Sequence, residues 1–229
     1  MSWPRTRVRY VLLSLVLGLG ASVAFPQEER NLLPKYGSLP KEEWQKEADA
    51  VFTFGMDKDY HGDRKKASEY MAARGWQYLR AGDPDDAMRR FNQPWLLNAS
   101  NGTALWGMGA VEADAGKFDE SLKLCAEAEP LVGKDINFSV DYARMLAMAG
   151  TQQKDGARLK EAFAHFEGVY KEAPLNILNL QNWANALFAL GRYAEAWDKV
   201  KLAEATPGKR QLDPKFVEAL QAKMPQPEK

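Results

Sequence analysis

The stretch GTALWGMGAVEADAG, residues 102–116, decides the fold of this chain because its layout returns at fixed intervals on both sides. In a 34-residue frame that opens with this stretch, residues of the same kind recur when the frame begins again at Ser68, Ile136 and Ile177. Self-similarity at a period of about 20 to 50 residues is typical of arrays in which each unit packs on the next. The sequence therefore predicts four consecutive repeats over residues 68–210.

Three positions of the frame are restricted in all four copies. The eighth and twentieth positions carry only Gly, Ala or Ser, and larger side chains there would separate two neighbouring helices. The fifteenth position is always glycine, which adopts the left-handed conformation without a Cβ penalty and so ends a helix. Each repeat is therefore expected to be a pair of antiparallel helices with its turn at that glycine. The residues, with an insertion allowed for in the third copy, are Gly75, Gly109, Ala143 and Ala184; Ala87, Ser121, Ala162 and Ala196; and Gly82, Gly116, Gly150 and Gly191.

This layout resembles the tetratricopeptide repeat, whose pattern has Trp, Leu, Gly and Tyr in the first helix and Ala, Phe and Pro further on. The fourth copy carries it most fully, with Leu180, Trp183, Ala184, Leu187 and Tyr193. The resemblance implies an all-α fold, namely a right-handed superhelical array of about four helix-turn-helix repeats. It also implies a capping helix at each end of the array.

Two features depart from the repeat pattern. Pro94 falls where the second helix of the first repeat should continue, and proline removes a backbone donor, so we expect that helix to kink or end within residues 90–93. In the third repeat Gly150 and Ala162 lie seven residues further apart than the frame allows. A longer turn or longer helices must accommodate this insertion.

The start of the chain reads as a secretory signal. Arginines precede an apolar run over residues 10–19, and small residues at Ser22 and Ala24 match what a signal peptidase reads, so we expect cleavage before Phe25. The expected location is the periplasm. The alternative is an uncleaved segment, residues 10–25, that anchors the chain in the inner membrane.

The remaining boundaries follow from the repeat frame. An amphipathic segment begins near residue 40, and its apolar residues Trp44, Ala48, Val51 and Phe52 are expected to dock on the first repeat, because a terminal repeat must hide one apolar side. The expected division is a signal peptide at 1–24, a linker without helix at 25–39, a capping helix and turn at 40–67, repeats at 68–101, 102–135, 136–176 and 177–210, a capping helix at 211–224 and a tail at 225–229.

Composition and motifs argue against several classes of function. The chain has 31 basic and 31 acidic residues, so a nucleic-acid partner is not expected. Its two histidines lie far apart, and no phosphate loop, zinc motif or nucleophile elbow occurs, so we expect no enzyme activity and no cofactor. Residues 57–68 begin as a calcium loop does, but Ser68 stands where a bidentate glutamate is needed, so no metal site is expected. The single cysteine, Cys125, is expected to be a buried thiol.

The resemblance to the tetratricopeptide repeat also implies a function, which is to bind a peptide or a partner helix in the groove lined by the first helices of the repeats. The positions that commonly face the groove in that family carry Trp76, Leu79, Trp106, Asn137, Arg144, Gln181, Asn185 and Phe188. Arg144 is expected to pair with a carboxylate. For Trp76 and Trp106 the alternative is that they pack between helices. The alternative function is a structural or oligomerising envelope component without a dedicated peptide ligand; a membrane is a partner only if the first segment is uncleaved.

Overall fold

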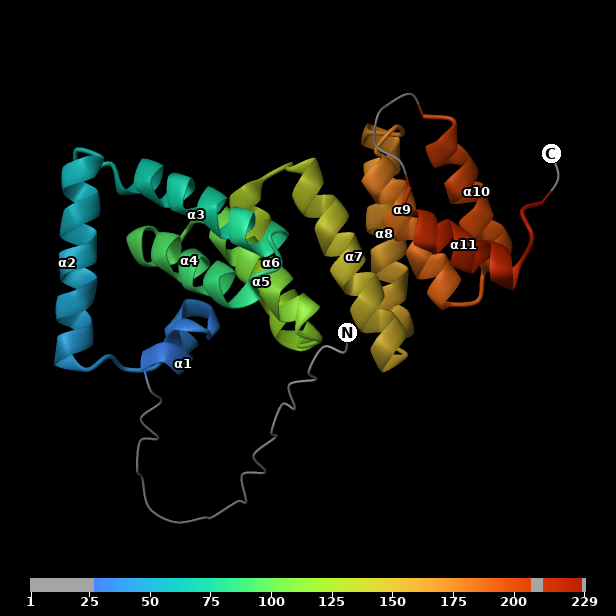
Figure 1. Cartoon of the computed structure of the whole chain (residues 1–229). Coiled ribbons are helices and arrows are strands. Elements are labelled where there is room, and N and C mark those ends of the chain that lie inside the picture. Colours follow the sequence, from blue (N-terminus) through green and yellow to red (C-terminus); the bar gives the residue numbers. More distant parts are fainter. Residues whose placement is uncertain (1–26, 207–211, 228–229) are drawn as a thin grey trace, which may run out of the picture.

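The computed structural model describes residues 27–206 and 212–227, and over these residues the chain is helical and contains no strand. Consecutive helices pack as hairpins, and the hairpins follow one another in a row (Figure 1). The all-α prediction is therefore confirmed. The hairpins are α3 (Arg64–Arg80) with α4 (Pro84–Leu97), α5 (Gly102–Asp114) with α6 (Phe118–Val132), α7 (Ile136–Gln153) with α8 (Gly156–Glu172), and α9 (Ile177–Ala189) with α10 (Tyr193–Glu204).

Some predictions fall outside the described residues. They are the signal segment at 1–24, its alternative as a membrane anchor at 10–25, and the end of the fourth repeat at 207–210. Among the helices of the described ranges, none combines the length and the apolar character that crossing a membrane requires.

Short polar side chains begin most of these helices. An Asp or Asn at the N-cap accepts a hydrogen bond from a backbone N–H of the first turn, which otherwise has no partner within the helix. This local chemistry marks where helices begin, and it acts within a few residues of each cap. The capping residues are Asp63, Asp83, Asn101, Asp135, Asp155, Asn176 and Asp213.

Three of the four frame glycines turn the chain as predicted. Gly82, Gly116 and Gly191 have φ angles of 79°, 77° and 74°. The prediction is wrong for Gly150, which lies inside α7, because that helix continues to its cap at Lys154. A Cβ at Gly150 would lie 2.8 Å from Cγ of Leu159 in α8, so this glycine allows close helix packing instead of a turn. The insertion in the third repeat thus lengthens its helices.

The restricted positions do bring helix backbones together. A Cβ at Gly109 in α5 would lie 2.9 Å from Sγ of Cys125 and 3.2 Å from the backbone oxygen of Ser121 in α6. A Cβ at Gly75 in α3 would lie 2.5 Å from the Phe91 ring of α4. Cys125 is fully buried, as expected, and burial raises the pKa of its thiol to about 12.

The helix of the first repeat does not end before its proline. α4 runs through Pro94 to Leu97, so of the two predicted outcomes, a kink or an end within residues 90–93, the end is wrong. The last turn is closed because the backbone N–H of Asn98 donates to the Pro94 oxygen at 2.9 Å, and the Ser68 hydroxyl donates to the same oxygen at 2.8 Å. A proline removes one donor, and these bonds keep the residues after it helical.

The segment interpreted as a linker contains two short helices. α1 (Gln27–Asn31) and the 3₁₀ helix η1 (Pro34–Ser38) contact α4. The buried amide of Asn92 in α4 donates 2.9 Å hydrogen bonds to the backbone oxygens of Asn31 and Leu33. The sequence indicated only that prolines and glycine discourage helix here, whereas this side chain satisfies the backbone groups of the irregular segment.

The two ends of the row are covered differently. At the C-terminal end, α11 (Pro214–Lys223) buries Leu220, and the indole N–H of Trp197 donates to the Met224 oxygen at 2.9 Å. At the N-terminal end, α2 (Glu43–Asp59) stands across the first hairpin and touches it through Phe52 and Met56 (Figure 1).

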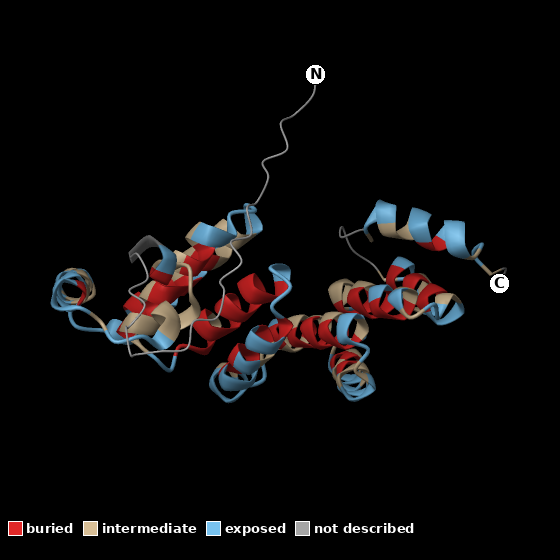
Figure 2. Ribbon diagram, turned by 90° about the horizontal axis from the view of Figure 1, so that it is seen from below, coloured by how far each residue is buried: buried red, intermediate tan, exposed pale blue. Residues whose placement is uncertain are grey.

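The face of α2 that was expected to dock is mostly turned outward. Trp44, Ala48 and Val51 are exposed, and only Phe52 of the predicted set packs on the first repeat. Figure 2 shows α2 end-on at one edge of the molecule, with exposed residues on its outer side. The docking face is set by Phe52 and Met56, of which only Met56 lies outside the predicted set.

Candidate binding site

The first helices of the first two repeats are joined by an aromatic cluster, made of Trp76, Phe91, Trp106 and Phe138. The Trp76 and Trp106 ring centroids lie 4.5 Å apart, and Trp106 meets Phe138 edge-on at 5.8 Å. The Phe91 ring, which comes from α4, lies 5.5 Å from the Trp76 ring between centroids. The cluster fills the space between α3, α5 and α7 with ring atoms, so it leaves little room for a ligand there.

Trp106 belongs to the core of the molecule. Its side chain is 9% exposed, and its indole N–H donates to the carboxylate of Asp141 at 3.1 Å. Trp76 is half-buried, and its indole nitrogen is buried without a hydrogen-bond partner among the described residues. Leu79 is half-buried and packs against the same core. Of the two alternatives for the tryptophans, the structure therefore shows the packing between helices.

Further along the row, a hollow of about 510 Å³ opens between α7, α9 and the start of α6. Its alanines are too short to fill the space, and its polar groups come from amides, one hydroxyl and one guanidinium. It therefore offers an apolar interior with hydrogen-bonding side chains around it, which is the usual make-up of a ligand site. The lining residues are Phe118, Arg144, Ala147, Met148, Thr151, Gln152, Asn182, Asn185, Ala186 and Ala189.

The insertion of the third repeat contributes to the hollow. α7 has 18 residues, whereas α5 and α9 have 13, and the extra length carries Thr151 and Gln152 along one side of the space. A helix that ended at Gly150 would lack both residues. The departure from the repeat pattern thus builds part of the candidate site.

Arg144 is already paired with two carboxylates. Its guanidinium lies 3.6 Å from Asp114 and 3.6 Å from Asp141, and Nη1 also contacts the Met148 sulfur at 3.4 Å. Burial raises the pKa of the Asp141 carboxyl, while Arg144 and the hydrogen bond from Trp106 act in the opposite direction. Because one cation faces two acids, this end of the hollow does not present an uncompensated positive charge to a ligand.

The other predicted groove residues lie in several places. Asn185 is exposed and lines the hollow, whereas Asn137 is exposed but does not line it. Gln181 accepts a hydrogen bond from the Asp213 backbone at 3.3 Å, and the Phe188 ring lies 5.8 Å from that of Phe216. Gln181 and Phe188 therefore contact the C-terminal segment. Of the eight predicted residues, the hollow brings together Arg144 and Asn185.

The sequence analysis missed most of the lining, including Asn182. This residue is 7% exposed, and its side-chain nitrogen is buried without a partner among the described residues. The sequence does contain a pattern that indicates this face of α9. The i, i+3, i+4, i+7 spacing of one helix face is followed by Asn182, Asn185, Ala186 and Ala189. The family positions for groove contact do not include Asn182, Ala186 or Ala189, and so that face was not recognised.

The calcium-like stretch is divided between two helices. Asp57 lies within α2 and forms two hydrogen bonds of 2.8 Å with Arg64 at the start of α3, and this pairing lowers the pKa of Asp57. Within residues 27–206 and 212–227, no group of three or more His, Cys, Asp or Glu side chains is placed to hold a metal ion.

No protein-family model matches this chain, and no curated protein is significantly similar to it.

Proposed function

We propose that this chain is a non-catalytic protein-protein interaction scaffold of the cell envelope, built as a tetratricopeptide repeat array, which binds a peptide or a partner helix in its groove. The observation that carries the proposal is the hollow on the first helices α7 and α9, where the resemblance expects the ligand. It is lined by apolar side chains, three amides, one hydroxyl and one guanidinium.

The lining defines the chemistry of the segment that would fit. Ala147, Ala186 and Met148 accept an apolar side chain, while the amides of Asn182 and Asn185 suit the donors and acceptors of a peptide backbone. A ligand carboxylate gains little, because Arg144 is already shared by two acids. We therefore propose a ligand with an apolar anchor side chain, and not an acidic one.

A panel of displayed peptides, selected against the full chain, tests this proposal when combined with a filling variant. Ala189→Trp places a large side chain at the edge of the hollow, whereas Ala194→Trp adds the same side chain at an exposed site of α10 outside it. We expect Ala189→Trp to weaken binding of the selected peptides at least tenfold, measured by calorimetry. Ala194→Trp should bind as the unaltered chain does.

The proposal fails if no peptide is enriched, or if the enriched peptides bind Ala189→Trp and the unaltered chain equally. A second experiment tests whether the ligand has an apolar anchor. Replacing the apolar anchor of a selected peptide by Glu should weaken binding, whereas an acidic anchor that binds more tightly would show that Arg144 is available to the ligand.

We also propose that the chain is exported and cleaved before Phe25. The basis is the Arg-rich start, the apolar run and the small residues Ser22 and Ala24. Sequencing the N-terminus of the protein from its own cells tests this directly. Recovery of Met1 in the membrane fraction would favour the anchored alternative.

The second candidate function is a structural or oligomerising envelope component without a dedicated peptide ligand. One specific observation favours it, namely the row of exposed apolar side chains on α2. Such a component would self-associate, and its hollow would have no ligand.

A further inference from the structure

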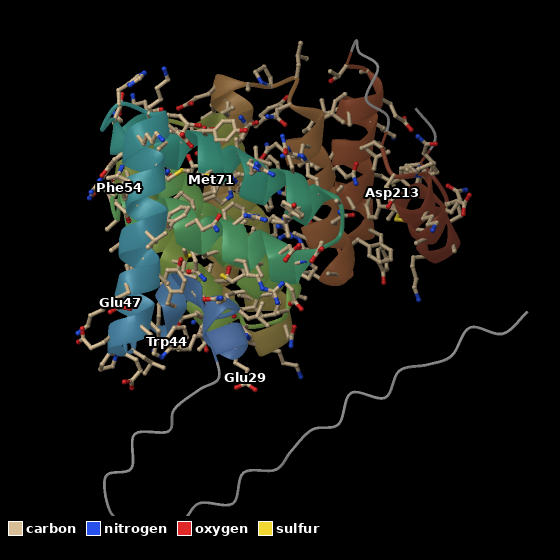
Figure 3. All side chains as sticks on the ribbon, turned by 60° about the vertical axis from the view of Figure 1, so that its left-hand side comes forward. Glu29, Trp44, Glu47, Phe54, Met71 and Asp213 are labelled. Carbon is tan, nitrogen blue, oxygen red and sulfur yellow. The ribbon has the colours of Figure 1, made fainter. Side chains whose placement is uncertain are left out.

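The outer side of α2 carries a regular row of exposed side chains. Trp44, Val51 and Phe54 are 53%, 73% and 72% exposed. Glu47 and Lys58, also exposed, complete the row at alternating spacings of three and four residues. Figure 3 shows Glu47 and Phe54 on the side of α2 that faces away from Met71. This five-residue row, called the outer seam below, has the spacing by which two helices pack side by side.

The outer seam differs from the other exposed apolar residues of the described ranges. These other residues are exposed singly, and single exposed apolar residues are ordinary on a protein surface. They lie on separate segments and are Leu39, Tyr70, Leu131, Leu175 and Leu202. On α2, by contrast, three large apolar side chains form a strip on one side of one helix, with Glu47 between Trp44 and Val51. The opposite face of α2 is held by Phe52 and Met56, so the strip points away from the molecule.

We propose that the outer seam pairs with the outer seam of a second copy of this chain, with the two α2 helices antiparallel. The charges of Glu47 and Lys58 favour a second copy as the partner, and they favour the antiparallel direction. When Val51 faces Phe54 of the other copy, the heptad spacing places Glu47 opposite Lys58, and twofold symmetry makes each contact twice. A parallel pair would instead place Glu47 against Glu47 and Lys58 against Lys58.

The residues that flank the seam permit a close approach. Ala48 and Ala50 are exposed and small, and a Cβ built at Gly55 would meet nothing within 4 Å. Because interaxial distance depends on the side chains at the contact, small flanking residues let the two helices approach closely. The hollow lies between α7 and α9, so self-association through α2 does not depend on the proposed peptide ligand.

Disulfide trapping of the full chain tests the pairing and its direction. The double variant Glu47→Cys with Lys58→Cys should form a covalent dimer under mild oxidation, because residue 47 of one copy faces residue 58 of the other. In this register the two residues 47 are offset by 58 − 47 = 11 positions. At about 1.5 Å per residue this is roughly 16 Å, beyond the reach of a disulfide. Each single variant should therefore remain uncrosslinked, and Cys125 does not interfere because it is buried.

Sedimentation of the full chain over a range of concentrations provides an independent measurement. Phe54→Glu should lower the association constant at least tenfold, whereas Leu175→Glu, a matched change at an exposed site outside α2, should leave it unchanged. Circular dichroism checks that both variants keep their helix content. The proposal is overturned if the double cysteine variant stays monomeric, or if the single variants crosslink. It is equally overturned if Phe54→Glu abolishes binding to phospholipid vesicles while self-association is unchanged.

Discussion

The aromatic cluster and the hollow occupy equivalent parts of the repeat frame, yet one is filled and the other is open. The ninth position of the frame is Trp76 in the first repeat, but Arg144 in the third and Asn185 in the fourth. The indole of Trp76 reaches Trp106, while Arg144 folds toward Asp114 and Asp141 and leaves the space between α7 and α9 unfilled. The frame therefore places the helices, whereas side-chain volume at a few positions decides where a ligand can enter.

Glycines make the closed region possible. Phe91 rests against the backbone of α3 at Gly75 and of α5 at Gly107, and a Cβ at either glycine would overlap its ring. The helices of the hollow carry alanines at lining positions, including Ala147 and Ala186, and the aromatic residue of its lining, Phe118, comes from α6. The first region should therefore be sensitive to small changes in volume, and the second should tolerate them.

The largest expected loss of stability comes from a substitution that breaks the aromatic cluster. Trp106→Ala removes a side chain that is 9% exposed and contacts two rings, so we expect the free energy of unfolding to fall by about 3 to 5 kcal/mol. Urea denaturation followed by circular dichroism measures this loss. Leu175→Ala, at a site 62% exposed, serves as the control and should stay within about 0.5 kcal/mol. A Trp106→Ala chain as stable as this control would contradict the packing role.

The next largest effect is expected where the Phe91 ring packs closely on Gly107. Gly107→Ala places a methyl group into the Phe91 ring, and overpacking of this kind costs about 1 to 3 kcal/mol. Gly168→Ala in α8 is the matched control, because a Cβ there meets nothing within 4 Å. That control should gain about 0.5 to 1 kcal/mol from the lower helix propensity of glycine.

A double-mutant cycle identifies the clash at Gly107. If the Phe91 ring causes the cost, Gly107→Ala should cost less in a Phe91→Leu background than in the unaltered chain, because the ring is then absent. An equal cost in both backgrounds would place the strain elsewhere.

The smallest effect concerns Asp141, which joins the two regions through Trp106 and Arg144. Burial raises the pKa of its carboxyl in the folded chain, so the folded chain holds a proton that the unfolded chain has released. The free energy of unfolding should therefore fall as pH rises from about 4 through the raised pKa. Urea denaturation of the unaltered chain and of Asp141→Asn at several pH values measures the difference. A difference between the two that stays constant, or that moves in favour of Asp141 as pH rises, would contradict this sign.

The sequence by itself determined the row of helical hairpins and most of its turns. Caps such as Asp83 and Asn101, and turn glycines such as Gly82 and Gly116, act on backbone groups within a few residues of themselves. The small residues at Gly109 and Ser121 likewise acted as predicted, because the hairpin brings them together over a short sequence distance. Such local effects can be inferred from residue type and spacing alone.

Only the tertiary structure decided the features that depend on which side chain fills a space between distant segments. Gly150 lies within a helix, where Leu159 of α8 packs close to it. Trp106 is a core residue because side chains of α3 and α7 pack against it. The outward face of α2 was decided by Phe52 and Met56, and the hollow by what Arg144 and its neighbours leave empty. Whether such a space is filled depends on the combined volume of side chains from several helices. Residues that lie far apart in the chain contribute to it, so a local sequence pattern does not predict it.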